Sequence, residues 1–247
     1  MIWRKTKFLF AAATVAVTAS SGLAATQGQV SLSHDIDTNH PEAYRDGIIT
    51  VSGGGHEGVD AYGGAYTFEL SNRSGLGDHL PGWGFCIDLT QEVGSGEFDV
   101  VALETVLDAD KTDALRELWG RNFRSQWLDG GFGRELEAFS AAVWEIVHET
   151  ERSPEADGYN ADYGAVWDVT RGSGFHATRL DGAGLANDWL AGLTRSPEAF
   201  AGNLRVLAND DLQDLLVMVP TPAAAWLGMA GLMALGGARQ LRRRREA

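Results

Sequence analysis

The segment GRELEAFSAAVWEIVHE, residues 133–149, carries the clearest helical pattern in the sequence. Its apolar residues recur at intervals of three and four, which is the spacing of a buried helical face. These residues are Leu136, Phe139, Val143, Ile146 and Val147. The interspersed glutamates, Glu135, Glu137, Glu145 and Glu149, are expected to lie toward solvent. The segment therefore predicts a helix that packs through one face against the rest of its domain.

The segments on either side of this helix have a different pattern. Short stretches rich in β-branched and aromatic residues, separated by glycines, predict strands within residues 47–54, 65–71, 82–89 and 97–103. Residues 108–123 predict a second helix, followed by a strand at 163–170, a short helix at 180–193 and strands at 203–208 and 212–219. Strands, then helices, then strands predict an α+β domain whose β-sandwich or barrel-like body carries a helical insertion.

The first 25 residues have the pattern of a secretory signal peptide. Arg4, Lys5 and Lys7 precede an apolar run over residues 8–19, and small residues follow at 22–25. This order of a positive start, a short apolar run and a small-residue end is typical of a cleaved export signal. We therefore expect residues 1–25 to be a signal peptide and the following domain to be exported.

The other end of the chain reads VPTPAAAWLGMAGLMALGGARQLRRRR over residues 219–245. It has no charged residue before Arg239, which suits a C-terminal membrane segment of the roughly 20 residues that a spanning helix needs. Arginines beside a membrane helix stay on the cytoplasmic side. The domain at residues 26–218 is thus expected outside the membrane, held either by a permanent anchor or by a sorting signal.

Composition limits the classes of partner. The chain has 20 basic and 34 acidic residues, and eight of the basic ones lie in the two terminal segments. The middle of the chain is therefore strongly acidic, which disfavours nucleic acid as a partner. The single cysteine, Cys86, cannot form a disulfide within the chain. No residue spacing points to a metal site or a cofactor.

Three segments together resemble a known class of surface protein. FCIDLTQEV, residues 85–93, resembles the cysteine strand of thioester-domain proteins, and AFSAAVWEIVHE, residues 138–149, resembles their partner helix. ANDDLQDLLVMVPTPAA, residues 208–224, resembles the passage into the sorting signal of exosortase-sorted proteins, known as PEP-CTERM with VPLPA- or VPTPAA-like relatives. The resemblance implies a thioester-domain-like extracellular domain at 26–218 and a C-terminal sorting signal at 219–247.

The resemblance also assigns roles within the tail. Val219, Pro220, Thr221 and Pro222 would be the motif recognised by an exosortase-type sorting transpeptidase, with Thr221 where the commonest form has Glu. Arg242, Arg243, Arg244 and Arg245 would form the cytoplasmic stop. The chain would then contact the inner membrane transiently and reside at the cell surface or in the extracellular matrix, with polysaccharide or matrix as partner.

The resemblance leaves the thioester pair incomplete. Cys86 corresponds to the thioester cysteine, whereas Ser140 stands where the family has glutamine, four positions before Trp144. A serine hydroxyl supplies no acyl group, and the glutamines at 91, 126 and 213 are expected to lie elsewhere. We therefore expect an inactive pair whose strand and helix still pack together, with Cys86 buried and unreactive. The role expected for the protein is structural or adhesive, and not enzymatic.

Two other classes of function compete with this interpretation. A tail-anchored glycan- or protein-binding module would use aromatic side chains, for which Trp83, Trp144, Trp167 and Trp189 are the candidates. A secreted cysteine hydrolase would need Cys86 beside a base such as His148 and an acidic residue that orients it. No local signature for such a hydrolase accompanies these residues.

Overall fold

The computed structural model describes residues 26–33, 48–53, 55–149, 167–170, 174–194 and 203–219. The expected signal peptide and the tail from Pro220 onward lie outside these residues. Within the described ranges, none of the helices has the length and apolar character needed to cross a membrane. The membrane segment expected in the tail remains a prediction.

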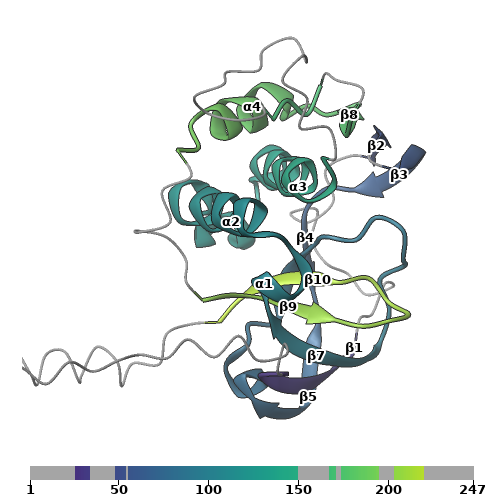
Figure 1. The fold of residues 1–247 in the computed structure, drawn as a ribbon, viewed down its shortest axis with the longest axis vertical. Coiled ribbons are helices and arrows are strands. Elements are labelled where there is room, and N and C mark those ends of the chain that lie inside the picture. The colour runs from purple at the N-terminus through teal and green to yellow at the C-terminus, as the bar shows by residue number, and fades with distance from the viewer. Residues whose placement is uncertain are drawn as a thin grey trace, which may run out of the picture.

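Among the described residues, the larger of two sheets has seven strands, and all its pairings are antiparallel. In spatial order they are β4 (Ala65–Thr67), β6 (Trp83–Cys86), β10 (Leu215–Met218), β9 (Leu204–Ala208), β7 (Gly96–Ala102), β1 (Gly28–Ser33) and β5 (Glu69–Gly75). The last strand of the domain, β10, therefore lies inside the sheet, between β6 and β9 (Figure 1).

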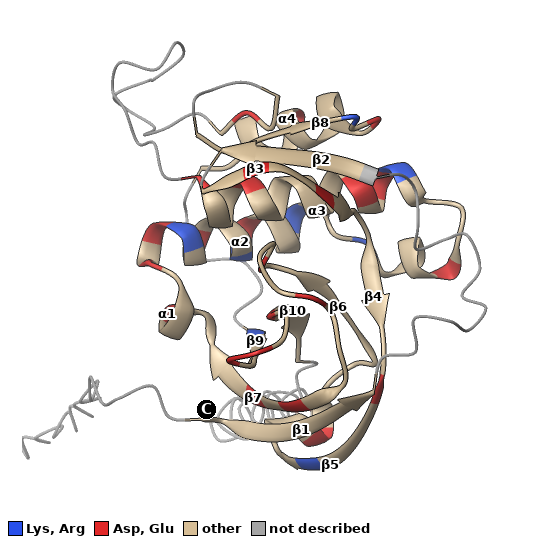
Figure 2. Ribbon diagram, turned by 90° about the vertical axis from the view of Figure 1, so that its right-hand side faces the viewer, with Lys and Arg blue, Asp and Glu red and all other residues tan. Residues whose placement is uncertain are grey.

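The two edges of this sheet belong to one continuous stretch of chain. β4 and β5 are separated only by Phe68, whose backbone N–H donates to the Gly82 carbonyl oxygen at 2.9 Å. A single extended segment can occupy both edges only if the sheet curls back on itself. Figure 2 shows this curl, with β1, β5 and β7 curving beneath β6 and β10. The concave side is filled by apolar residues such as Val30, Phe98 and Val217.

The helices lie between β7 and β9 in the sequence and gather beyond one end of the curled sheet (Figure 1). They are α1 (Leu103–Val106), α2 (Ala109–Asn122), α3 (Gly133–His148) and α4 (Ala183–Ala191), with short 3-10 turns at Leu76–His79 and Ser125–Asp129. The Asp108 carboxylate accepts the Lys111 backbone N–H at 2.9 Å and so caps the start of α2. The predicted helix at residues 133–149 is confirmed.

A second sheet of three strands lies against the side of α3. Its order is β3 (His56–Tyr62), β2 (Ile48–Gly53) and β8 (His176–Thr178), and both pairings are antiparallel. Its inner face places Ile49 and Val51 of β2 in one apolar cluster with Cys86 and Trp144. The small sheet therefore covers the point where β6 meets α3.

The predicted α+β class is confirmed, with a curled antiparallel sheet and a group of helices. The strand expected at 163–170 is wrong where the structure describes it, because residues 167–170 are not in a strand and the chain turns at Val169 and Thr170. The Asp168 side chain accepts both the backbone N–H and the hydroxyl of Thr170, at 2.9 and 2.7 Å. Such a local bond favours a turn over a strand ladder.

The expectation that the glutamates of α3 face solvent is wrong for Glu137 and Glu145. Both are buried, and Glu145 is only 1% exposed. Each carboxylate accepts a backbone N–H from a neighbouring loop: Glu137 from Asp181 at 3.3 Å, and Glu145 from Asp168 at 3.0 Å. α3 is surrounded by the sheets, α2 and the segment before α4. Its two buried glutamates therefore hydrogen-bond to loops and hold them against the core.

Candidate functional site

The strand and the helix singled out in the sequence meet at Cys86. The indole Nε1–H of Trp144, on α3, donates to the Cys86 carbonyl oxygen at 2.9 Å. Both residues belong to an apolar cluster that includes Leu89 and Phe175. β6 and α3 are therefore joined by a buried hydrogen bond as well as by packing.

Ser140 lies one helical turn before Trp144 and binds the chain beside Cys86. Its hydroxyl accepts the Gly64 backbone N–H at 2.8 Å and donates to the Gly64 carbonyl oxygen at 3.2 Å. β4 pairs with β6 in a register that places Ala65 opposite Phe85, so Gly64 comes next to Cys86. The hydroxyl thus satisfies a buried peptide group close to the cysteine.

The Cys86 thiol is buried and free. Its Sγ donates to the Asp88 carbonyl oxygen at 2.9 Å. Burial in apolar surroundings raises the pKa of the Cys86 thiol well above its usual range. Since the thiolate is the nucleophilic form, the folded domain holds this sulfur in its unreactive form at neutral pH. The predicted burial is confirmed.

Contrary to expectation, the structure brings Gln213 to this site. Its side-chain Nε2 donates to the Asp88 carbonyl oxygen at 2.5 Å, which is the same acceptor that the Cys86 thiol uses. Gln213 is 7% exposed, and its Oε1 has no hydrogen-bond partner among the described residues. Pairing of Leu215 with Cys86 in the β10–β6 ladder places the glutamine there. Sequence reasoning missed it because this pairing joins distant parts of the chain.

His148 occupies the last turn of α3 at the edge of the same cluster. Its Nδ1 lies 3.3 Å from Nε2 of His56, and its ring stacks on Phe175 with centroids 5.9 Å apart. Burial, together with the neighbouring His56, lowers the pKa of His148 to about 4. In the described part of the chain, Cys86 and His148 form no hydrogen bond with each other. The thiol–imidazole bond that a cysteine hydrolase needs is not formed there.

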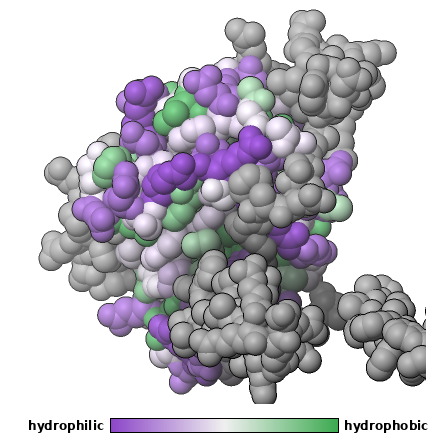
Figure 3. Space-filling view, turned by 90° about the vertical axis from the view of Figure 1, so that its left-hand side faces the viewer, coloured by the Kyte–Doolittle hydropathy of each residue, from purple (hydrophilic) through white to green (hydrophobic). Residues whose placement is uncertain are grey.

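The four tryptophans considered for sugar stacking are either buried or stacked on other rings. Trp144 and Trp167 are buried. Trp83 is half-buried and stacks on Trp119 with centroids 5.9 Å apart, and Trp189 stacks on Trp127 at 5.7 Å. On the face shown in Figure 3, hydrophilic side chains are interspersed with apolar ones. These contacts indicate that the tryptophans contribute mainly to the core.

Val219 is the one residue of the expected sorting motif that the structure describes. Its side chain is 5% exposed, and its backbone N–H donates to the Asn203 carbonyl oxygen at 3.0 Å. The motif therefore begins at a residue that still belongs to the folded domain. Pro220, Thr221, Pro222 and Arg242 to Arg245 lie outside the described residues.

Acidic side chains form no metal centre in the part of the chain that the structure describes. Within the described ranges, no group of three or more His, Cys, Asp or Glu side chains is placed to hold a metal ion.

Comparisons with protein-family models, with curated proteins and with solved structures give no match to this chain. The geometry of the chain and the resemblance of its segments are therefore what bear on its function.

Proposed function

We propose that this chain is an exported cell-surface or extracellular-matrix protein with a structural or adhesive role. Its C-terminal segment would be sorted by an exosortase-type transpeptidase. The observation that carries the proposal is the Trp144–Cys86 hydrogen bond, because it joins the two separate segments on which the family resemblance depends. The signal-peptide pattern and the tail pattern at the two ends support the same interpretation.

The exported domain would be a degenerate thioester-type domain with a barrel-like body and a helical insertion. Ser140 stands at the position of the acyl-donating glutamine, and its hydroxyl is engaged with Gly64. Cys86 is buried beneath the small sheet. Such a domain would act through its acidic surface and its shape, without a covalent bond at Ser140.

The tail would be processed directly beside the folded domain. Val219 makes the last described hydrogen bond of the domain, to Asn203. Pro220 has no backbone N–H to continue the ladder, so the chain would leave the sheet at this point and enter the membrane within a few residues. The arginines at 242–245 would keep the far end of the tail in the cytoplasm.

Intact mass of the mature protein tests this proposal. In a host that has the sorting enzyme, we expect surface-extracted protein to lack residues 1–25 and the arginine cluster. Pro220→Ala with Pro222→Ala should leave the tail attached, whereas Pro81→Ala, in a loop outside the motif, should be processed normally. Mature wild-type protein that retains Arg245 would contradict sorting and favour a tail-anchored binding module.

A second candidate function is suggested by the shared contact of Cys86 and Gln213. Both side chains donate to the Asp88 carbonyl oxygen, which places a thiol beside a carboxamide. In a thioester-forming reaction, the sulfur would attack Cδ of Gln213, the carbon–nitrogen bond would break, and the thiol proton would leave with ammonia. The raised pKa of the Cys86 thiol opposes this reaction in the closed domain.

Mass spectrometry separates the two candidates. A domain that contains the thioester would have a mass lower by one ammonia than the mass calculated from its sequence. This deficit would be absent in Cys86→Ala and in Gln213→Glu. It would persist in the control Gln91→Ala. Full mass with one thiol titratable after unfolding would contradict the covalent candidate. That result would leave the non-covalent surface protein as the proposed function.

A further inference from the structure

The small sheet is held to the end of α3 by two histidines. His56 begins β3 and is buried, and His148 ends α3. The two rings are nearly perpendicular, with centroids 4.8 Å apart and Nε2 of His56 3.3 Å from Nδ1 of His148. A hydrogen bond between two imidazoles needs one N–H donor and one unprotonated acceptor. The contact is therefore compatible with a neutral pair or with one proton added, and not with two charged rings.

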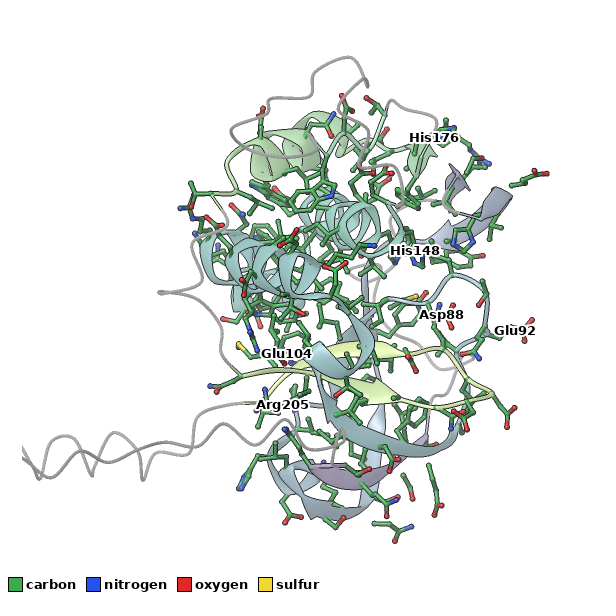
Figure 4. The ribbon with its side chains drawn as sticks, viewed as in Figure 1. Asp88, Glu92, Glu104, His148, His176 and Arg205 are labelled. Atoms are coloured by element: carbon green, nitrogen blue, oxygen red, sulfur yellow. The ribbon has the colours of Figure 1, made fainter. Side chains whose placement is uncertain are left out.

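The charged groups around the pair act in opposite directions on a second positive charge. From α2, the Lys111 ammonium donates to the Val147 carbonyl oxygen at 2.6 Å, beside His148. From the segment after β6, Asp88 attracts a proton to His148, but its Oδ1 accepts two bonds from Thr90, at 2.8 and 2.7 Å. Figure 4 shows Asp88 and His148 between the curled sheet and the small sheet.

The remaining neighbours come from the residue after α3, from β3, from β8 and from the residue before β8. The Glu149 carboxylate accepts the Phe175 backbone N–H at 3.2 Å. Glu57 follows His56 and is exposed, whereas His176 lies on β8 near its own Gly174 carbonyl oxygen, at 3.5 Å. Nε2 of His148 is buried and makes no well-aligned hydrogen bond to the described residues, while the nearby Ile87 backbone favours the protonated ring. No carboxylate there binds the His148 ring.

The small sheet also covers the cysteine. Ile49 and Val51 of β2 and Ala177 of β8 share an apolar cluster with Cys86 and Trp144. Among the described strands, β3 is one of the two edges of this sheet and pairs only with β2. Loosening β3 from α3 would therefore loosen the apolar cover above the thiol.

We propose that His56 and His148 form an acid-sensitive latch that keeps the small sheet closed over Cys86 and opens when both rings are protonated. Two imidazolium N–H groups directed at one another would repel, and Lys111 would add to the repulsion. The cover would then open locally while the curled sheet stays folded, and the thiol would become accessible. This inference does not depend on export or sorting.

The test is the rate at which Cys86 in the full chain reacts with dithiodipyridine, a thiol reagent that also works in acid. Lowering the pH from about 7 to about 4 brings the solution to the pKa of His148, which is about 4, and so raises the protonated fraction of its ring. We expect the labelling rate to rise accordingly. Amide hydrogen exchange should accelerate in β2 and β3, and the amides of β7 and β9 should stay protected.

Matched variants identify the pair as the cause. His56→Gln, or His148→Gln if the first variant does not fold, keeps a hydrogen-bonding side chain that does not titrate and should remain closed in acid. His176→Gln, on β8 of the same sheet, should open like the wild type. The proposal would be overturned by a wild-type thiol that stays protected at about pH 4. It would equally be overturned by opening of the Gln variants at the wild-type pH, or by β7 and β9 exchanging together with β3.

Discussion

The buried carboxyl of Glu145 should make the stability of this domain fall as the solution becomes mildly alkaline. Burial, with Glu149 and Asp168 nearby, raises the pKa of Glu145 from 4.5 to about 8. Between these values the folded chain keeps a proton that the unfolded chain releases. The free energy of unfolding therefore decreases with rising pH in this range, by about 1.4 kcal/mol per pH unit. Below pH 4.5 the proton is bound in both states, so the contribution is complete there.

His148 has the opposite effect in acid. Its pKa is lowered from 6.5 to about 4 by burial, so the unfolded chain binds the extra proton in this range and stability rises with pH. From about pH 4.5 to 6.5 the two slopes nearly cancel. Above about pH 6.5 only the contribution of Glu145 still changes with pH, and it lowers the free energy of unfolding by about 2 kcal/mol by pH 8. That loss is a substantial part of the 5–15 kcal/mol typical of a domain.

Glu145→Gln should remove the decrease in the free energy of unfolding with rising pH. The increase with pH that His148 causes in acid should then become visible. The amide can still accept the Asp168 backbone N–H but has no proton to lose. We expect the free energy of unfolding of the variant, relative to wild type, to rise by about 3 kcal/mol between about pH 5.5 and pH 8. Urea unfolding followed by tryptophan fluorescence measures it. Glu135→Gln, the same change near the start of α3, is the control.

A difference between variant and wild type that stays constant across this pH range would refute the reasoning. It would mean that Glu145 is already ionised in the folded protein. The hydrogen bond from Asp168 would then outweigh burial.

Three further predictions concern Cys86 and its neighbours. The Cys86 thiol should resist a maleimide in the native protein at neutral pH and react after unfolding, so fast native labelling would contradict the raised pKa. Trp144→Phe should lower the free energy of unfolding by about 1–3 kcal/mol, because the Cys86 carbonyl loses its buried donor; an unchanged urea midpoint would mean that water replaces the indole. Ser140→Ala should cost a similar ~1–3 kcal/mol by leaving the Gly64 peptide unsatisfied, and a neutral result would show that the peptide finds another partner.

Much of the secondary structure was predictable because it follows local patterns. The apolar spacing around Phe139 and Val143 identified α3. The same pattern failed for Glu137 and Glu145, since periodicity identifies the main buried face and not whether the opposite face is covered as well. β3, with the sequence HEGVDAY, has few of the residues that mark strands and was missed. It is held by pairing with β2, which the local sequence does not encode.

The candidate site was only partly predictable for the same reason. The neighbourhood of Cys86 and Ser140 followed from a resemblance of short segments. Gln213 comes to Cys86 through the β10–β6 pairing, and His56 comes to His148 through the packing of the small sheet. Neither contact leaves a signal at a fixed spacing in the sequence.

The stretch from Ala65 to Gly75, which supplies both edges of the curled sheet, limits how the domain can be altered. An inserted residue near Phe68 would displace the pairing of β4 with β6 and that of β5 with β1 together, because the two ladders share one covalent segment. New termini created there by circular permutation would free both edges at once. Tags, reporters and permuted ends therefore belong elsewhere, for example at the exposed turn around Gly131, where a Cβ would meet nothing within 4 Å. The length of the stretch from Ala65 to Gly75 should be among the least variable features of any relative.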